Sequence, residues 1–166
     1  GSPYEYIDQQ MSTAWTDINS LDPQRILLMP CNGTKIYEYK KEGVRKPGFS
    51  KVYETNMIQS MGKESYRILV SILTDLQNYV IESQKKVPMS GNFISFRGSL
   101  VNWCMIGRDA DHKMRSEFVM LDKGLRTSFK NKLDRQLQAG QLKDIQTALG
   151  GSTSIDIYPK GWDKTY

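Results

Sequence analysis

Histidine and cysteine are scarce in this chain of 166 residues, which has one histidine, His112, and two cysteines, Cys31 and Cys104. A single histidine excludes a multi-histidine metal site, and two distant cysteines exclude a CxxC metal clamp and a dense disulfide framework. His112 lies in a strongly polar stretch, so we expect its ring to be solvated. Low cysteine use is typical of reducing compartments, and we expect a cytoplasmic location.

Long apolar runs and clustered charge of one sign are also missing. The longest runs, Ile26–Pro30 and the serine-interrupted Ile68–Leu73, fall far short of the roughly 18 residues that a membrane span needs. The 23 Lys and Arg against 18 Asp and Glu give a net charge of +5, but the basic residues are dispersed among acidic ones. We therefore expect no membrane span and no nucleic-acid partner.

The first 50 residues predict a helix followed by short strands. Apolar residues at spacings of three and four favour an amphipathic helix over residues 3–19. Ile26–Pro30 predicts a short buried strand, and Thr34–Tyr39 alternates as a second one after an Asn32-Gly33 turn. Glycine, proline and charged residues over Lys40–Ser50 indicate an exposed connection, where we place a domain boundary.

The remaining residues predict an α+β fold, with an antiparallel sheet covered by helices on one face. Apolar residues of helical period indicate a long helix from about Met61 to Gln84. The strands Asn92–Arg97 and Leu100–Ile106 flank Gly98-Ser99, which is typical of an antiparallel hairpin. Three further elements are expected, namely a helix capped by Asp122 and stopped by Gly140, a short helix over Leu142–Leu149 and a strand over Thr153–Tyr158.

Polar side chains gather on one face of the expected sheet. The two-residue period of a strand puts Asn102 on the same face as Arg108, and Ser154 beside Asp156, opposite two isoleucines that should face the helices. Arg97 ends the first expected strand of the hairpin, and Arg108 lies at the end of the second. Guanidinium groups fit phosphate oxygens in pairs, and a hydroxyl beside a carboxylate suits sugar hydroxyls. These residue types favour a sugar phosphate, although strand-end arginines that are merely solvated are the alternative.

Several separated motifs occur between about residues 58 and 166. In chain order they are Gly91–Arg97, Asn102, Ile106-Gly107-Arg108, Arg115–Phe118, Leu121–Lys123, Gly150-Gly151, Ser154–Asp156 and Pro159–Lys164. Together they resemble the eukaryotic-type phosphomannomutase family, which residues 1–57 match more loosely.

This family belongs to the haloacid-dehalogenase-type phosphotransferases, in which a Rossmann-like core carries the chemistry and an inserted α/β cap binds the sugar phosphate. The resemblance implies that residues 1–50 are a partial core segment, 51–160 the cap and 161–166 the return to the core. It also implies a homodimer formed through the cap.

The resemblance also implies functional residues. Three arginines would hold the phosphate distant from the reacting one, and a serine and an aspartate would contact the sugar or its phosphate. Lys164 matches the core lysine that lies beside the nucleophilic aspartate. The substrate-binding residues that it implies are Arg97, Asn102, Arg108, Arg115, Ser154 and Asp156.

The activity implied is the interconversion of mannose 6-phosphate and mannose 1-phosphate for GDP-mannose biosynthesis, through a phosphoaspartyl enzyme, Mg²⁺ and a hexose 1,6-bisphosphate activator. The family's DxDxT motif, which supplies the nucleophile, is absent here, and we interpret Asp109-Ala110-Asp111 as a loop or helix cap. The acidic magnesium-binding motif is absent too. We therefore expect a complete protein to be the enzyme and these residues alone to be inactive.

Two other functions stay open, a sugar-phosphate phosphatase of the same superfamily and a non-catalytic sugar-phosphate-binding or dimerisation module. The family's Asn-Gly-Met after the first arginine is Gly98-Ser99-Leu100 here, and its usual proline before Ile-Gly-Arg is Met105. Because these departures fall near the implied sugar site, they leave the preferred hexose open.

Overall fold

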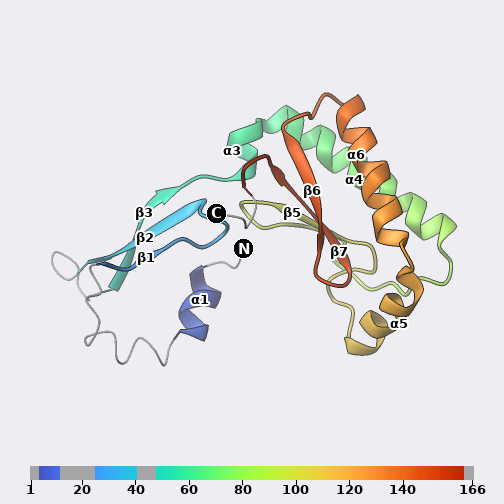
Figure 1. Cartoon of the computed structure of the whole chain (residues 1–166), viewed down its shortest axis with the longest axis horizontal. Coiled ribbons are helices and arrows are strands. Elements are labelled where there is room, and N and C mark those ends of the chain that lie inside the picture. Colours follow the sequence, from blue (N-terminus) through green and yellow to red (C-terminus); the bar gives the residue numbers. More distant parts are fainter. Residues whose placement is uncertain (1–3, 12–24, 41–47, 163–166) are drawn as a thin grey trace. The chain divides into compact units, whose positions relative to one another are not determined.

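The computed structural model describes residues 4–11, 25–40 and 48–162 (Figure 1). They form two compact units, one made of the described residues up to Asn56 together with Trp162, and the other of Met57–Gly161. Within the described part, no helix is both long and apolar enough to cross a bilayer.

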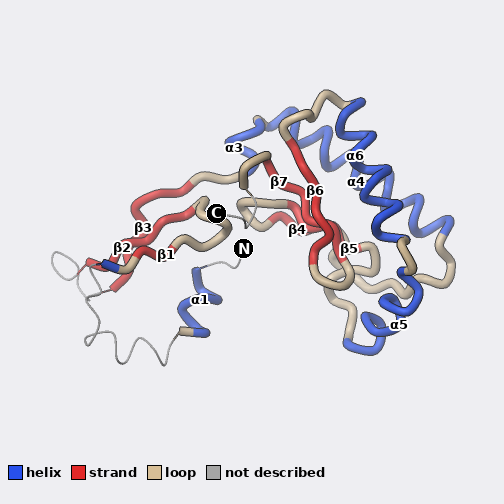
Figure 2. The backbone as a smooth tube through the Cα atoms, in the orientation of Figure 1, coloured by secondary structure: helices blue, strands red, loops and turns tan. Residues whose placement is uncertain are grey.

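The first unit contains a three-stranded antiparallel sheet with the order β1-β2-β3 (Figure 2). The ring of Tyr4 stacks on that of Tyr37, with centroids 4.2 Å apart, and so packs the helix on the central strand. Burial raises the pKa of the Cys31 thiol in the turn before that strand. The described elements are α1 (Tyr4–Gln10), β1 (Leu27–Leu28), β2 (Lys35–Lys40) and β3 (Gly48–Glu54).

The strands of this unit match the sequence patterns only in part. The strand expected over Thr34–Tyr39 is confirmed as β2. A strand lies within the expected range Ile26–Pro30, but its length and burial were wrong, because β1 has two residues and both Leu27 and Met29 are 56% exposed.

The helix and the connection expected in this unit each include residues outside the described ranges. The helix expected over residues 3–19 is observed as α1, and 12–19 lie outside the described residues, as do 41–47. The connection expected over Lys40–Ser50 ends too late, since β3 already begins at Gly48 and pairs with β2. An edge-to-face contact between Tyr39 and Phe49 supports this pairing. Because the contact joins two strands, a local sequence pattern does not reveal it.

The second unit is a four-stranded antiparallel sheet with the order β4-β5-β7-β6, and α4 and α6 lie along one of its faces (Figure 1). This confirms the predicted α+β class. The hairpin of β4 and β5 and the strand β7 also agree with the sequence patterns. The elements are α3 (Met57–Met61), α4 (Lys63–Ser83), β4 (Ile94–Phe96), β5 (Val101–Cys104), α5 (His112–Asp122), α6 (Leu125–Ala139), β6 (Ile145–Gly150) and β7 (Ser154–Pro159).

The core of this unit lies between the sheet and the two long helices. Leucines of α4 and α6 recur every three or four residues on their buried faces. Trp103 of β5 is fully buried, donates its indole N–H to Oε1 of Gln77 on α4 at 2.8 Å, and meets the ring of Phe129 on α6 edge-on. Ile155 and Ile157 of β7 are completely buried, as expected for the face that packs on helices.

Residues 142–149 do not form the helix that their composition suggests. Ile145–Gly150 is instead the strand β6, which pairs along its whole length with β7. A segment this short has little helical stability of its own, so pairing in the sheet decides its conformation.

The residues before α6 also differ from expectation. Asp122 is not the N-cap of α6 but the last residue of α5, and α6 follows Gly124, whose φ is 95°. Asp122 Oδ1 nevertheless accepts a hydrogen bond from the main-chain N–H of Arg126 at 2.8 Å. The helix α5 was not predicted, although Asp111 caps it by accepting from the N–H of Met114, which agrees with a loop or cap at residues 109–111.

Gly107, in the turn after β5, is expected to be intolerant of alanine. Its φ is 83°, and a Cβ there would lie 2.3 Å from the carbonyl oxygen of Gly91 and 2.5 Å from Oγ of Ser90. Gly107→Ala should therefore lower the free energy of unfolding by about 2 to 5 kcal/mol, from the left-handed backbone and the clash together. Urea unfolding followed by circular dichroism at 222 nm would measure the loss.

Gly62→Ala is the matched control for this substitution. Gly62 has the same φ of 83°, with a ψ of 152° that is essentially restricted to glycine, but nothing within 4 Å of a Cβ, so only the backbone cost of about 1 to 3 kcal/mol applies. Equal losses in the two variants would contradict the steric argument.

Candidate functional site

Polar side chains form a row across the sheet of the second unit, on the face opposite α4 and α6. The register places Ser95 of β4 beside Asn102 of β5, and Asn102 beside Asp156 of β7. Trp103 and Ile155, which neighbour these residues along their strands, form the next pair and point to the other face. The alternation that packs the isoleucines against the helices therefore turns the polar residues to the opposite face of the sheet.

Asn102 connects the members of this row. Its Nδ2 donates to Oγ of Ser154 at 2.9 Å and to Oδ1 of Asp156 at 2.6 Å. Its Oδ1 accepts from Nη1 of Arg108 at 3.4 Å. Because Asn102 is 3% exposed and uses both ends of its amide, it fixes the serine and aspartate on one side and the arginine on the other.

A second arginine, Arg115 of α5, lies beside Arg108. Its Nη2 donates to the carbonyl oxygen of Arg108 at 2.6 Å, its Nε to that of Ala110 at 2.9 Å, and its Nη1 to Oγ1 of Thr153 at 3.1 Å. These contacts order the guanidinium group against the loop after β5 and the turn before β7. Two cationic groups therefore lie at one end of the polar row, which is suited to an anion.

Arg97 lies at the other end of the hairpin. Its main-chain N–H donates to Leu100 at the hairpin turn, whereas the N–H of Arg108 donates to Asn92, five residues before Arg97. At about 3.3 Å per residue the main chains of the two arginines are roughly 16 Å apart along the strand. Of the residues that the sequence singled out, hydrogen bonds join five, Asn102, Arg108, Arg115, Ser154 and Asp156. Arg97 follows Ser95 of the polar row by two residues, at the end of the hairpin away from Arg108, and Lys164 lies outside the described residues.

The glycine that ends β6 makes room for the carboxylate of the row. A Cβ on Gly150 would lie 2.8 Å from the carboxyl carbon of Asp156. Ser154 Oγ donates to the carbonyl oxygen of Gly150 at 2.8 Å. The Gly150-Gly151 pair belonged to the matching motifs, but its close approach to the carboxylate becomes visible only in three dimensions.

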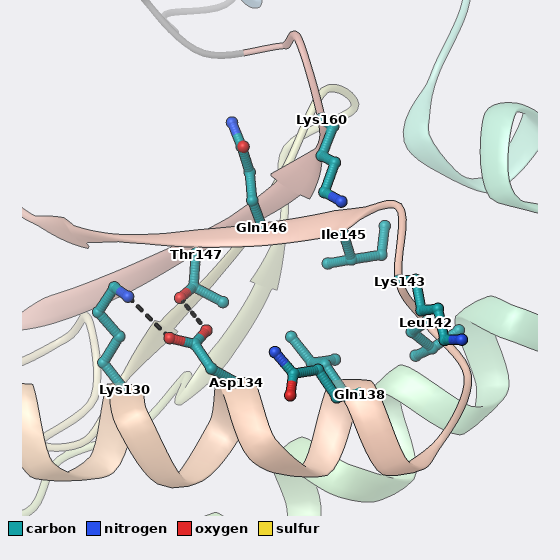
Figure 3. A pocket seen from close by; sticks show the side chains of 10 residues that line it. Lys130, Asp134, Gln138, Leu142, Lys143, Ile145, Gln146, Thr147 and Lys160 are labelled. Carbon is teal, nitrogen blue, oxygen red and sulfur yellow. Dashed lines mark hydrogen bonds and ion pairs between the residues drawn. The ribbon is translucent and has the colours of Figure 1, made fainter.

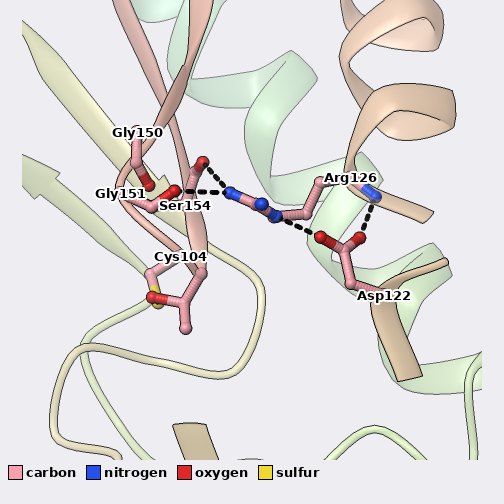
Figure 4. Close-up of polar contacts among 7 residues, drawn as sticks. Cys104, Asp122, Arg126, Gly150, Gly151 and Ser154 are labelled. Carbon is pink, nitrogen blue, oxygen red and sulfur yellow. Dashed lines mark hydrogen bonds and ion pairs between the residues drawn. The ribbon is translucent and has the colours of Figure 1, made fainter. Parts of the chain in front are cut away.

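Thr153, Cys104 and Arg126 also contact the site, and the sequence patterns did not select them. Cys104 Sγ lies 3.6 Å from the Thr153 hydroxyl that accepts from Arg115, and Arg126 approaches the carbonyl oxygens of Gly151 and Ser154 (Figure 4). Cys104 follows Asn102 by two residues on β5, and Thr153 directly precedes Ser154, whereas Arg126 reaches the site from α6, so no local signal distinguishes it. Among residues 4–11, 25–40 and 48–162, no three His, Cys, Asp or Glu side chains form a group that could hold a metal ion.

Comparison with known proteins shows the family of this chain. The family model for eukaryotic phosphomannomutase matches residues 28–166, which is most of the chain. The chain belongs to the eukaryotic phosphomannomutase family. The motifs that resembled this family, from Gly91 to Lys164, fall inside the matched region.

Individual phosphomannomutases agree with the family match. A phosphomannomutase of Drosophila melanogaster is 31% identical over 145 residues, 81% of this chain and 54% of that protein. One of Saccharomyces cerevisiae is 30% identical over 138 residues, 81% of this chain and 48% of that protein. A probable phosphomannomutase of Caenorhabditis elegans is 37% identical over 99 residues, 57% of this chain and 38% of that protein. The chain thus spans about half the length of the curated relatives that it matches.

Proposed function

We propose that the unit Met57–Gly161 is the substrate-binding cap of a phosphomannomutase, which in its complete form interconverts mannose 6-phosphate and mannose 1-phosphate. The observation that carries the proposal is a hydrogen-bonded group. Asn102, Ser154 and Asp156 on one sheet face join the side chain of Arg108, and Arg115 of α5 joins through the main-chain oxygen of Arg108. The family match supports the reaction class.

The site has a cationic half and an acidic half, and this division suggests how a sugar phosphate would lie. Asn102 stands between them, since its oxygen accepts from Arg108 while its nitrogen donates to Asp156. A phosphate would bind beside Arg108 and Arg115, away from the carboxylate that repels it. The sugar hydroxyls would donate to Asp156 and exchange hydrogen bonds with Ser154.

The exposed position of Arg108 suits a substrate that must bind in two orientations. In the proposed reaction a phosphoaspartyl enzyme gives its phosphoryl group to a hexose monophosphate, and the resulting hexose 1,6-bisphosphate turns round and gives up its other phosphate. The distal phosphate is therefore carried by either end of the sugar. Arginines bind such a phosphate through charge and paired N–H groups, which do not depend on the configuration of the sugar carbon.

The nucleophilic aspartate and the magnesium ligands of this proposal would come from residues other than those described here, among which no three His, Cys, Asp or Glu side chains form a group that could hold a metal ion. Magnesium, when bound, would neutralise charge on the transferring phosphoryl group. The low cysteine content of the chain, two in 166 residues, supports the cytoplasmic location that we propose. Homodimerisation through the cap stays a prediction.

The proposal predicts that the 166-residue chain binds mannose 1-phosphate and mannose 6-phosphate with similar affinity. Charge-assisted contacts contribute about 1.5 to 3 kcal/mol each, so two arginines should give a millimolar or tighter Kd, about 4 kcal/mol or more. Isothermal titration calorimetry with each phosphate would measure it, and unphosphorylated mannose is the control. No saturable heat at about ten times the expected Kd, or equal binding of mannose itself, would reject the proposal.

A further inference from the structure

An ion pair at the corner between α5 and α6 reaches the turn that carries the serine of the site (Figure 4). Nε of Arg126 donates to Oδ2 of Asp122 at 2.6 Å, and the main-chain N–H of Arg126 donates to Oδ1 at 2.8 Å. Nη1 of Arg126 donates to the carbonyl oxygen of Gly151 at 2.9 Å and lies 3.5 Å from that of Ser154. One side chain thus joins the helix corner to both sides of the turn between β6 and β7.

The direction of this guanidinium group is fixed. The side chains of Arg126 and Asp122 are only 13% and 15% exposed, so water screens the pair weakly. Both oxygens of the carboxylate accept from Arg126, one from its main chain and one from its side chain. Because Nε is held in this way and the guanidinium group is planar, Nη1 points to the turn between β6 and β7.

The turn needs such support because its two sides are bound to the polar row. Ser154 turns its hydroxyl to Asn102 and to the carbonyl oxygen of Gly150, while its own carbonyl oxygen faces Arg126. Gly150 packs against the carboxylate of Asp156. A shift of the turn would therefore move the serine and the aspartate together.

We propose that Arg126, oriented by Asp122, is a positioning residue of the sugar-phosphate site. It holds the turn between β6 and β7 so that Ser154 and Asp156 keep the separation and direction that the sugar hydroxyls require. This inference rests on the proposed function, because it concerns the affinity of that same site.

The same helix supplies a matched control (Figure 3). Lys130 of α6 pairs with Asp134 at 2.8 Å, and Asp134 accepts from the hydroxyl of Thr147 on β6. This pair also joins α6 to the sheet, but it contacts the middle of β6 and not the turn. Lys130→Met and Arg126→Met each remove one paired cation from α6, and only the second removes the contacts to Gly151 and Ser154.

The test compares these two variants with the unaltered 166-residue chain and with Arg126→Lys, at a temperature at which all four are folded. Calorimetry gives the Kd for mannose 1-phosphate, and amide hydrogen exchange gives the protection of residues 150–156. We expect Arg126→Met to raise the Kd about tenfold, Arg126→Lys to give an intermediate value, and Lys130→Met to change it less than about twofold. Exchange of residues 150–156 should quicken selectively in Arg126→Met.

The outcomes separate this inference from the proposed function. If the unaltered chain binds and Arg126→Met binds within twofold of it, the positioning role is overturned and the proposed function stands. An exchange increase spread evenly over the unit, with no change in Kd beyond that of Lys130→Met, also overturns it. If the unaltered chain does not bind, the proposed function fails and the positioning role falls with it. If Arg126→Met does not fold, the Kd of Arg126→Lys decides in the same way.

Discussion

Replacing Arg108 with alanine is expected to weaken the binding of mannose 1-phosphate by about tenfold or more, with little loss of stability. Arg108 is exposed, and its side chain makes one long hydrogen bond, 3.4 Å, to Asn102. Its charge is therefore available to a ligand at small cost to the fold. Loss of a charge-assisted contact of about 1.5 to 3 kcal/mol corresponds to roughly ten- to a hundredfold in Kd, which calorimetry would measure.

Lys132→Ala is the control for this loss of charge. Lys132 lies on α6 with its ammonium group 3.6 Å from the ring centroid of Tyr79, on the helical side of the sheet. Its removal lowers the net charge by the same amount and should change the Kd less than about twofold. Equal and small effects of Arg108→Ala and Lys132→Ala would show that the phosphate binds elsewhere.

Arg115 offers a contrast, because it binds the chain as well as a proposed ligand. Its guanidinium group donates to Ala110, Arg108 and Thr153, so part of its contribution is to order the loop on which Arg108 lies. Arg115 thus orders the loop that carries Arg108. Because Arg108 is the more exposed of the two and makes fewer contacts with the chain, its substitution is the clearer test of phosphate binding.

The faces of the sheet could be predicted from the sequence, but the neighbours across it could not. A period of two residues was enough to put Ser154 and Asp156 on one face and the isoleucines on the other. That Asn102 lies between them and Arg108 depends on the pairing of β5 with β7, which are separated by α5, α6 and β6. No local pattern encodes such a pairing.

The separation of Arg97 from Arg108 illustrates a consequence of topology. Both follow the end of a strand, and two such ends are adjacent in a parallel sheet. In an antiparallel hairpin they lie at opposite ends, because the chain reverses between them. The hairpin was predicted from Gly98-Ser99, so this distance was implicit in the sequence, whereas the motifs alone group the two arginines.

Short elements were the ones that local patterns misassigned. Long periodic segments such as α4 were predicted, since burial of Leu69, Leu73 and Leu76 repeats over many turns. β6 has six residues with helix-forming neighbours, and α5 has a mostly exposed surface with only Phe118 buried. In both, contacts with distant elements outweigh weak local preferences.

The largest loss of stability is expected for Trp103→Ala. Trp103 is fully buried, its ring meets Phe129 edge-on at 6.0 Å, and its N–H binds Gln77, which is itself 5% exposed. The substitution would leave a cavity between the sheet and both long helices, and it would leave Oε1 of Gln77 without its donor. We expect the free energy of unfolding to fall by about 4 to 6 kcal/mol, from the cavity and the unpaired amide oxygen together.

Trp103→Phe separates these two contributions. It keeps most of the apolar volume but removes the indole N–H, so the loss should be about 1 to 3 kcal/mol, which is the cost of the unpaired amide. Urea unfolding followed by circular dichroism at 222 nm would measure both variants, because α4, α5 and α6 all belong to this unit. A loss below about 2 kcal/mol for Trp103→Ala would contradict its central place in the core.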